Sequence, residues 1–183
     1  MIESLEHYRH VAENAELLWP KTEVLDALDR MARNIAQDLS DKNPILLCVM
    51  TGGVVVMGHL ATRLAFPLQM DYVHATRYRG ATKGGELNWI AHPSMTLQGR
   101  EVLLVDDIFD EGVTLKALAH YCVDQGVKSV ESAVLVSKIH DRKVNYNPKY
   151  IGLEVPDRYV YGFGMDYKDY WRNAAGIYAV QGL

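Results

Sequence analysis

Short apolar runs alternate with helix-like segments along the middle of this chain, and this alternation most constrains its fold. Residues 45–50, 101–105 and 129–136 are rich in Ile, Leu and Val, and each run is too short for a typical buried helix. Segments 54–64 and 114–125 have the character of the helices that connect such strands. A strand, helix, strand order implies parallel pairing with helices on the faces of the sheet. We therefore predict an α/β fold with a mainly parallel central sheet flanked by helices.

Further elements are expected before and within this core. An amphipathic helix is predicted after Thr22, which can cap it, and its apolar residues recur at helical spacing up to Leu39. Residues 68–75 predict another strand. The polar segment 77–88, which contains three glycines, predicts a mobile loop.

The C-terminal part has a different pattern. From Pro148 onward, short aromatic segments are separated by glycines and a proline, which predicts extra strands in a small subdomain, or hood. We expect a single domain over residues 1–183, with a core of about 22–140 and a hood formed by about 1–20 and 148–183.

Composition excludes several classes of function. With 183 residues, 49% hydrophobic content and a net charge of −4, the chain can bury a sizeable core but offers no basic face for nucleic acid. No apolar run reaches membrane-spanning length, and the N-terminus does not resemble a signal peptide, so we expect a cytoplasmic protein. Cys48 and Cys122 lie in apolar patterns and predict buried free thiols.

The segment from Val102 to Thr114 predicts a ligand site. Its apolar strand ends in Asp106 and Asp107, and Asp110 and Gly112 then lead into a helix. Ligands of open α/β sheets bind at the carboxyl ends of strands, and amides at a helix N-terminus attract phosphate. Carboxylates bind ribose hydroxyls or Mg²⁺. A ribose phosphate with Mg²⁺ suits both parts of the segment, because the acids can bind the ribose hydroxyls or Mg²⁺ and the start of the helix can bind the phosphate.

These residues resemble the phosphoribosyl pyrophosphate (PRPP) motif of type I phosphoribosyltransferases. Lys138, the segment 155–167 and Arg172 are similar to the purine-binding and pyrophosphate-binding end of hypoxanthine-guanine phosphoribosyltransferases, and 50–53 lies where that family has its pyrophosphate loop. The resemblance runs from about Ile45 to the C-terminus. It implies the type I phosphoribosyltransferase fold.

The resemblance also implies a role for each matching residue. Asp110 is expected to be the general acid/base, and Lys138 to meet the 6-oxo group of the purine, because a lysine only donates hydrogen bonds. The 5′-phosphate and PRPP would be bound by Asp106, Asp107, Asp110, Glu111, Gly112, Val113 and Thr114; pyrophosphate by Thr51, Gly52, Gly53 and Arg172; the base by Lys138, Tyr159, Val160 and Asp166; and Mg²⁺ by Asp106, Asp107 and Asp166.

Three positions depart from the family pattern. Thr51 stands where relatives often have a lysine, and Glu111 where they commonly have a hydroxyl residue, so its side chain is expected to point outward. In the loop, Tyr78 matches an aromatic residue that closes over PRPP, whereas Arg77 replaces a common serine. One cationic contact to pyrophosphate, that of the lysine, is therefore missing, and the loop side chain at Arg77 differs from that of the family.

Structural explanations compete with each functional one. Asp110 can be a plain helix N-cap, Gly52 and Gly53 a simple turn, and Arg172 or Lys138 a surface charge. Tyr159, Tyr161 and Phe163 can be alternating packing residues of a hairpin. A phosphorelay receiver also gathers acids around Mg²⁺, but it needs no aromatic hood. The seven histidines show no metal-binding motif and receive no role.

The sequence thus predicts a Mg²⁺-dependent phosphoribosyltransferase of purine salvage, which converts hypoxanthine, and guanine, with PRPP into the nucleotide and pyrophosphate. Alternatives are a xanthine-preferring enzyme and a noncatalytic PRPP sensor or RNA-binding regulator on the same fold. The expected partners are small molecules, with neither nucleic acid nor membrane, and a second copy of the chain in a homodimer or homotetramer.

Overall fold

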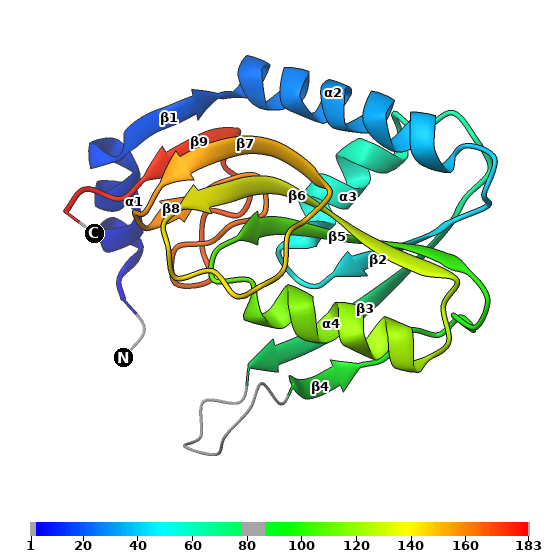
Figure 1. The fold of residues 1–183 in the computed structure, drawn as a ribbon. Helices are drawn as coiled ribbons and strands as arrows, with labels where there is room; N and C mark the ends of the chain where they lie inside the picture. Colours follow the sequence, from blue (N-terminus) through cyan, green and yellow to red (C-terminus); the bar gives the residue numbers. More distant parts are fainter. Residues whose placement is uncertain (1–2, 78–86, 183) are drawn as a thin grey trace.

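A six-stranded sheet forms the centre of the protein (Figure 1). The computed structural model describes residues 3–77 and 87–182. The strand order is β4-β3-β2-β5-β6-β7, and all neighbours pair in parallel except β4, which is antiparallel to β3. The bounds are β2 Ile45–Val49, β3 Gln69–Arg77, β4 Leu87–Ala91, β5 Glu101–Phe109, β6 Ser129–Ile139 and β7 Tyr150–Pro156.

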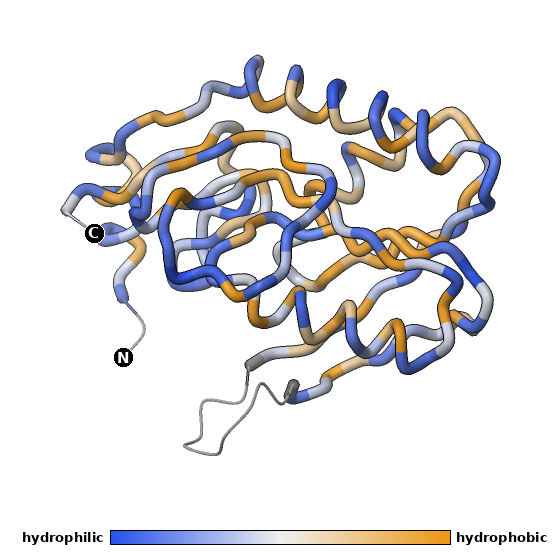
Figure 2. Tube along the Cα trace, in the orientation of Figure 1, coloured by the Kyte–Doolittle hydropathy of each residue, from blue (hydrophilic) through white to orange (hydrophobic). Residues whose placement is uncertain are grey.

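Helices cover both faces of this sheet, because its inner strands are apolar on both sides. α2 (Lys21–Leu39) and α3 (Gly53–Ala61) pack on one face, and α4 (Val113–Asp124) packs on the other. Successive side chains of β5 alternate between the two cores: Leu103 and Val105 join the α2 and α3 side, whereas Leu104 joins the α4 side. Figure 2 shows apolar residues concentrated on these strands and polar ones on the outer side of α2.

A second, three-stranded sheet joins the two ends of the chain. β1 (Glu16–Pro20) pairs antiparallel with β9 (Gly176–Ala179), and β9 pairs with β8 (Val160–Tyr161). α1 (Leu5–Asn14) covers this end through Tyr8 and Val11, which cluster with Tyr161, Tyr167 and Val180. The indole N–H of Trp19 donates to the carbonyl of Glu154 at 3.0 Å and so ties β1 to β7.

The main predictions of architecture are confirmed: the sheet is mainly parallel, and helices flank it. The prediction that Thr22 caps the first amphipathic helix is wrong, since α2 begins at Lys21 with Pro20 at the N-cap. β5 is longer than expected and continues to Phe109. The division into a core and a hood stays a prediction.

Three elements, α1, β1 and β4, had no predicted counterpart. α1 buries only Tyr8 and Val11, too few apolar positions to reveal a helix by periodicity. β4 covers Leu87–Ala91, which overlaps the end of the expected loop, and its pairing with β3 is a long-range contact. Residues 78–86 of that loop lie outside the described part of the chain.

Both cysteines are buried and unpaired, as predicted, and they lie on opposite faces of the sheet. Burial raises the pKa of Cys48 to about 12 and that of Cys122 to about 11, so both thiols stay protonated at neutral pH. Among residues 3–77 and 87–182, no helix is long and apolar enough to cross a membrane.

Replacing Leu103 by Ala should cost about 3 kcal/mol of folding free energy, because this fully buried side chain fills the core between β5 and the helices. Urea unfolding measures the loss. Leu17→Ala, which removes the same atoms from a side chain that is 50% exposed, is the matched control and should change stability by less than about 0.5 kcal/mol. Equal losses in the two variants would contradict this description of the core.

Candidate active site

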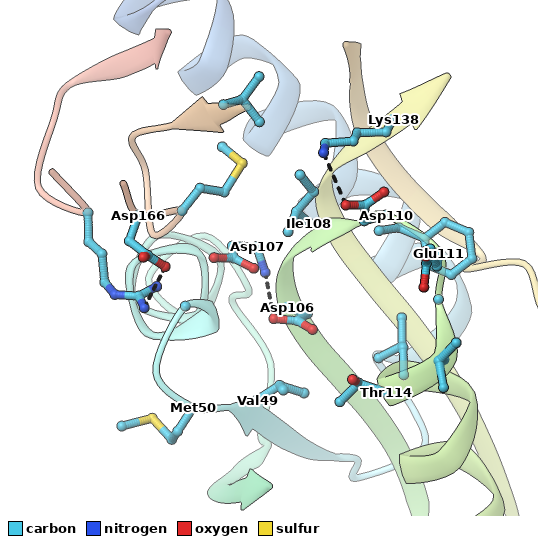
Figure 3. A pocket seen from close by; sticks show the side chains of 18 of the residues that line it. Val49, Met50, Asp106, Asp107, Ile108, Asp110, Glu111, Thr114, Lys138 and Asp166 are labelled. Atoms are coloured by element: carbon cyan, nitrogen blue, oxygen red, sulfur yellow. Dashed lines mark hydrogen bonds and ion pairs between the residues drawn. The ribbon is translucent and has the colours of Figure 1, made fainter. Parts of the chain in front are cut away.

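A cavity opens where β5 extends past its neighbour β2. β2 pairs with β5 only as far as Val105, whereas β6 pairs with it to Phe109, so the last residues of β5 have a strand on one side only. The cavity has a volume of about 620 Å³ and lies at the carboxyl ends of β2, β5 and β6 (Figure 3). Small-molecule sites of α/β sheets have this size and position.

Asp106 and Asp107 lie on the part of β5 that extends past β2. The backbone N–H of Asp107 donates to Oδ1 of Asp106 at 2.9 Å, and Asp107 itself is buried. Burial raises the pKa of both carboxyls, and for Asp106 the neighbouring charge of Asp107 raises it further. Two such groups are stable as anions only when a cation compensates them.

Glycines allow three segments to meet behind this pair. A Cβ on Gly52 would lie 2.1 Å from Oδ2 of Asp107, and a Cβ on Gly164 would lie 2.2 Å from the carbonyl oxygen of Gly52. Gly53, the first residue of α3, approaches Val105 so closely that a Cβ would lie 2.5 Å from its carbonyl oxygen. The peptide bond between Met50 and Thr51 is cis. The close approaches at Gly52 and Gly53 leave no room for a side chain at either position.

The chain then turns from β5 into α4 through Gly112. This residue has φ +82°, and a Cβ there would lie 2.3 Å from the Phe109 ring, so glycine is required on both counts. Gly112 is the N-cap of α4 and no side chain caps the helix, so the structural explanation of Asp110 as an N-cap is wrong. The first amides of α4 have no intrahelical acceptor and border the cavity at Val113 and Thr114.

Asp110 is bound on both oxygens by basic side chains. Strand pairing ends with Phe109 opposite Ser137, so the next residues, Asp110 and Lys138, lie side by side. Nζ of Lys138 is 3.0 Å from Oδ2, and Nε2 of His140 is 2.8 Å from Oδ1. Burial raises the pKa of Asp110, but the hydrogen bonds from His140 and Lys138 and the charge of Lys138 outweigh it, and the pKa lies below its usual value.

The far wall of the cavity comes from the segment around β8. Tyr159 is 40% exposed at the cavity, beside the buried Val160, which pairs with Ala179 in the small sheet. Arg172 lies 2.7 Å from Oδ1 of Asp166 and donates to the carbonyl of Gly164, also at 2.7 Å. Arg172 is thus a partly buried residue with fixed partners.

Most of the predicted site residues meet in this cavity. They are Gly52, Asp106, Asp107, Asp110, Glu111, Gly112, Val113, Thr114, Lys138, Tyr159, Val160, Asp166 and Arg172. Thr51 and Gly53 are not among the residues that line it. Arg77 ends β3, nothing is described of its side chain, and Tyr78 lies outside the described residues. Tyr161 and Phe163 are buried packing residues, as the competing explanation held.

His140, Ile108 and Met165 had no role in the site predicted from the sequence. Ile108 and Met165 line the cavity and supply apolar surface between its charged groups. His140 was given no role, yet it contacts Asp110. A signal existed, because His140 stands two residues after Lys138, one residue past the end of β6, and residues two apart in an extended chain face the same side.

Carboxylates outnumber cationic side chains among the described residues of the cavity. Five residues with carboxylates line it, against two with cationic side chains, Lys138 and Arg172; the five are Asp106, Asp107, Asp110, Glu111 and Asp166. An anionic ligand would therefore need backbone amides or bound metal ions to attract it. The oxygen-rich pair Asp106 and Asp107 suits a hard divalent cation.

A second acidic group is less suited to a metal. Asp110, His140 and Asp157 bring ligand atoms within 4.8 Å of one another. However, Arg142 binds both oxygens of Asp157, at 2.7 and 3.0 Å, and Lys138 pairs with Asp110. Basic side chains already neutralise both carboxylates.

Comparison with known proteins identifies the family of this arrangement. The family model described as "Phosphoribosyl transferase domain" matches residues 20–168. The hypoxanthine-guanine phosphoribosyltransferase of Staphylococcus epidermidis is 28% identical over 158 residues, which cover 86% of this chain and 88% of that protein.

Solved structures show the same likeness over nearly the whole chain. A hypoxanthine phosphoribosyltransferase from Staphylococcus aureus superposes with a TM-score of 0.88 at 25% identity, covering 99% of this chain and 97% of the other. A hypoxanthine-guanine-xanthine phosphoribosyltransferase superposes with a TM-score of 0.80 at 26% identity, covering 91% and 94%.

Replacing Asp106 by Asn should stabilise the ligand-free protein by an amount that grows with pH. The folded protein raises the pKa of Asp106, so its contribution to stability is fully present below the pKa of the unfolded state and is lost as the pH rises from there through the folded pKa. Asn cannot ionise and escapes this loss. Urea unfolding from mildly acidic to mildly basic pH checks the prediction.

The control is Asp124→Asn at an exposed position of α4, for which the difference from the parent should stay small across the pH range. An Asp106→Asn difference that is flat, or that shrinks as the pH rises, would refute the assigned pKa direction.

Proposed function

The chain belongs to the phosphoribosyl transferase domain family, and from this premise we propose that it is a purine-salvage phosphoribosyltransferase. It transfers ribose 5-phosphate from PRPP to hypoxanthine, and to guanine, and releases pyrophosphate. The observation that carries the proposal is the pairing of Asp110 with Lys138 at one end of a cavity whose other parts are an acid pair and an uncapped helix N-terminus.

The 5′-phosphate binds to main-chain amides of residues 110–114. With no cation on this turn, and with Glu111 beside it, attraction comes from the first amides of α4 and from the hydroxyl of Thr114. The open end of the helix, at Gly112, supports this assignment. The outward orientation of the Glu111 side chain remains part of the proposal.

The purine binds between Lys138 and the segment around Tyr159. Lys138 has only hydrogen-bond donors, so it favours a 6-oxo group over the 6-amino group of adenine. Tyr159 offers an exposed ring for stacking, Ile108 offers apolar surface, and Val160 contributes backbone groups at the edge of the base.

Asp110 acts as the general base. As N9 of the base bonds to C1′, the bond from C1′ to pyrophosphate breaks with its electron pair, and the base loses a ring proton. The Asp110 carboxylate accepts that proton near N7. Its lowered pKa keeps it ionised and ready at neutral pH.

Mg²⁺ fits the acid pair. Asp106 and Asp107 are adjacent carboxylates in surroundings that oppose their charge, and they would be the main ligands. Asp166, which is paired with Arg172, would add a further oxygen from across the cavity. A bound Mg²⁺ would neutralise charge on the pyrophosphate leaving group. Asp106 and Asp107 also accept hydrogen bonds from the ribose hydroxyls.

Pyrophosphate binds to the turn of Thr51, Gly52 and Gly53, with Arg172 as the cationic partner. Gly52 brings this turn against Asp107, which supports a shared site for metal and diphosphate. Arg172 is already held by Asp166, so it approaches the leaving group in a fixed position. Arg77 and Tyr78 belong to the proposed closing loop.

The location, partners and assembly of the protein are proposed from its membership of the same family. We assign it to the cytoplasm, with PRPP and a 6-oxopurine as its partners, and to a homodimer or homotetramer. Met70, Tyr72 and Ile90, exposed apolar side chains of β3 and β4, support self-association. The small sheet with α1 would be the hood over the purine, and the six-stranded sheet the core.

Asp110→Ala should lower kcat by about 10²-fold or more, because general-base catalysis contributes roughly that much, while PRPP still binds. Nucleotide formation from hypoxanthine, PRPP and Mg²⁺ is followed by absorbance, and PRPP binding by calorimetry. Asp124→Ala on α4 is the control and should match the parent. Full activity of Asp110→Ala would remove this residue from the mechanism.

Lys138→Met should lower kcat/KM for hypoxanthine by about 10-fold or more, as expected for a lost charged hydrogen bond. The ratio of kcat/KM for hypoxanthine to that for adenine should fall as well. The ratio of the two bases isolates the 6-position, because any effect through Asp110 is common to both. Lys149→Met, a lysine paired with Asp38 away from the cavity, is the control.

A competition assay with hypoxanthine, guanine, xanthine and adenine tests the parent protein. A clear preference for xanthine would revise the substrate. Failure to form any nucleotide would overturn the proposed function in favour of a regulator.

A further inference from the structure

His140 contacts the proposed general base, although it does not line the cavity. Its Nε2 atom is 2.8 Å from Oδ1 of Asp110, and Lys138 binds the other oxygen, Oδ2. Lys138 lines the cavity, whereas the His140 side chain is only 4% exposed. The two oxygens therefore have different neighbours, one that a purine can reach and one that lies behind the site.

The hydrogen bonds of the ring define its tautomer. The backbone N–H of Arg142 lies 3.2 Å from Nδ1 of His140, and an amide N–H can only donate. Nδ1 must therefore carry the lone pair, and in the neutral ring the proton is on Nε2. Nε2–H then donates to Asp110, and both ring nitrogens are satisfied.

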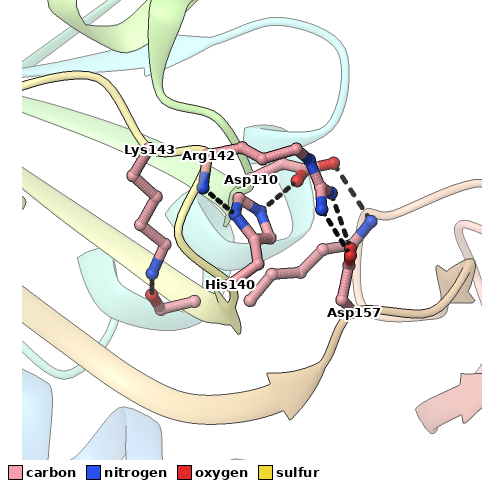
Figure 4. A network of polar contacts seen from close by, with 7 residues as sticks. Asp110, His140, Arg142, Lys143 and Asp157 are labelled. Carbon is pink, nitrogen blue, oxygen red and sulfur yellow. Dashed lines mark hydrogen bonds and ion pairs between the residues drawn. The ribbon is translucent and has the colours of Figure 1, made fainter.

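The ring is held in place by the chain around it. β6 ends at Ile139 opposite Pro156 of β7, so His140 and Asp157 are the next residues on neighbouring strands. Arg142 binds both oxygens of Asp157, at 2.7 and 3.0 Å, and this ion pair closes the loop over His140 (Figure 4). Such a bidentate pair fixes the backbone of Arg142. The N–H of Arg142 donates to Nδ1 of His140, so the orientation of the ring is fixed as well.

We propose that His140 is a positioning residue: its Nε2–H group holds Oδ1 of Asp110 so that Oδ2 faces the purine and accepts its proton. This inference rests on the proposed function. It goes beyond it because it divides the work between the two basic residues. Lys138 must share its ammonium group with the 6-oxo group of the base, whereas His140 has no contact with the cavity and keeps its hydrogen bond throughout.

The other charged groups near Asp110 and His140 are unchanged in every variant that tests the role of His140. Lys138 faces Asp110 from β6, Arg142 and Asp157 lie behind His140, and Glu111 follows Asp110 in the chain. Asp110 must be ionised to accept a proton. Because donation from His140 favours the ionised form, its loss should raise the pKa of Asp110 and move the acid limb of the kcat/KM profile to higher pH.

Two amide substitutions separate positioning from a structural role. A Gln amide nitrogen reaches the place of Nε2, so His140→Gln keeps the contact with Asp110. An Asn amide lies near the place of Nδ1, so His140→Asn keeps the hydrogen bond from Arg142 but loses Asp110. His140→Leu loses both, and His120→Gln at an exposed site of α4 is the control.

The measurements are pH profiles of nucleotide formation, with KM for PRPP, for all four variants and the parent. We expect kcat to fall about tenfold in His140→Asn and His140→Leu, with the acid limb at higher pH, an unchanged KM for PRPP and substantial recovery in His140→Gln. Near-parental behaviour of His140→Asn with loss in His140→Gln would show a loop-supporting role and overturn the proposal.

Nitrogen-15 NMR of the His140 ring in the parent protein gives a reading that needs no activity. The Nε2–H tautomer is expected, and an Nδ1–H tautomer would overturn the proposal. Failure of the parent to form nucleotide would instead count against the proposed function, so the two failures are distinguishable.

Discussion

The site depends on one constraint, the extension of β5 beyond the end of β2. Up to Val105 the strand has neighbours on both sides and carries apolar residues for two cores. Past Val105 one side is open, and the residues change at once to Asp106 and Asp107. Carboxylates can exist there because a ligand can reach the open end of β5. In the part of β5 that is paired on both sides, the same side chains would be buried without a compensating cation.

The close packing behind this edge explains why the site is built from glycines as well as acids. Gly52 and Gly164 let two distant segments meet at Asp107, so the loop after β2 and the segment after β8 are positioned by the same contact. Any side chain at either position would push these segments apart. The pyrophosphate and purine ends of the proposed site are therefore mechanically linked through one buried carboxylate.

Charge is distributed unequally over the cavity. Asp106 and Asp107 are buried, and the charge of Arg172 only partly offsets the effect of burial on their pKa, whereas Asp110 is bound by Lys138 and His140 on its two oxygens. The pKa directions differ accordingly, raised at Asp106 and lowered at Asp110. One group of carboxylates is thus suited to a cation, and the other is a stable anion suited to accept a proton.

The sequence by itself determined the mainly parallel sheet and the segment from Asp106 to Thr114, because these depend on local periodicity and on a change from apolar to acidic residues. The resemblance to phosphoribosyltransferases also predicted Lys138 as a contact of the purine base. Only the tertiary structure decided that β4 joins β3, that α1 covers the ends of the chain, and that His140 binds Asp110. These contacts depend on how separate elements come together in the folded chain, which the local pattern of any one segment does not encode.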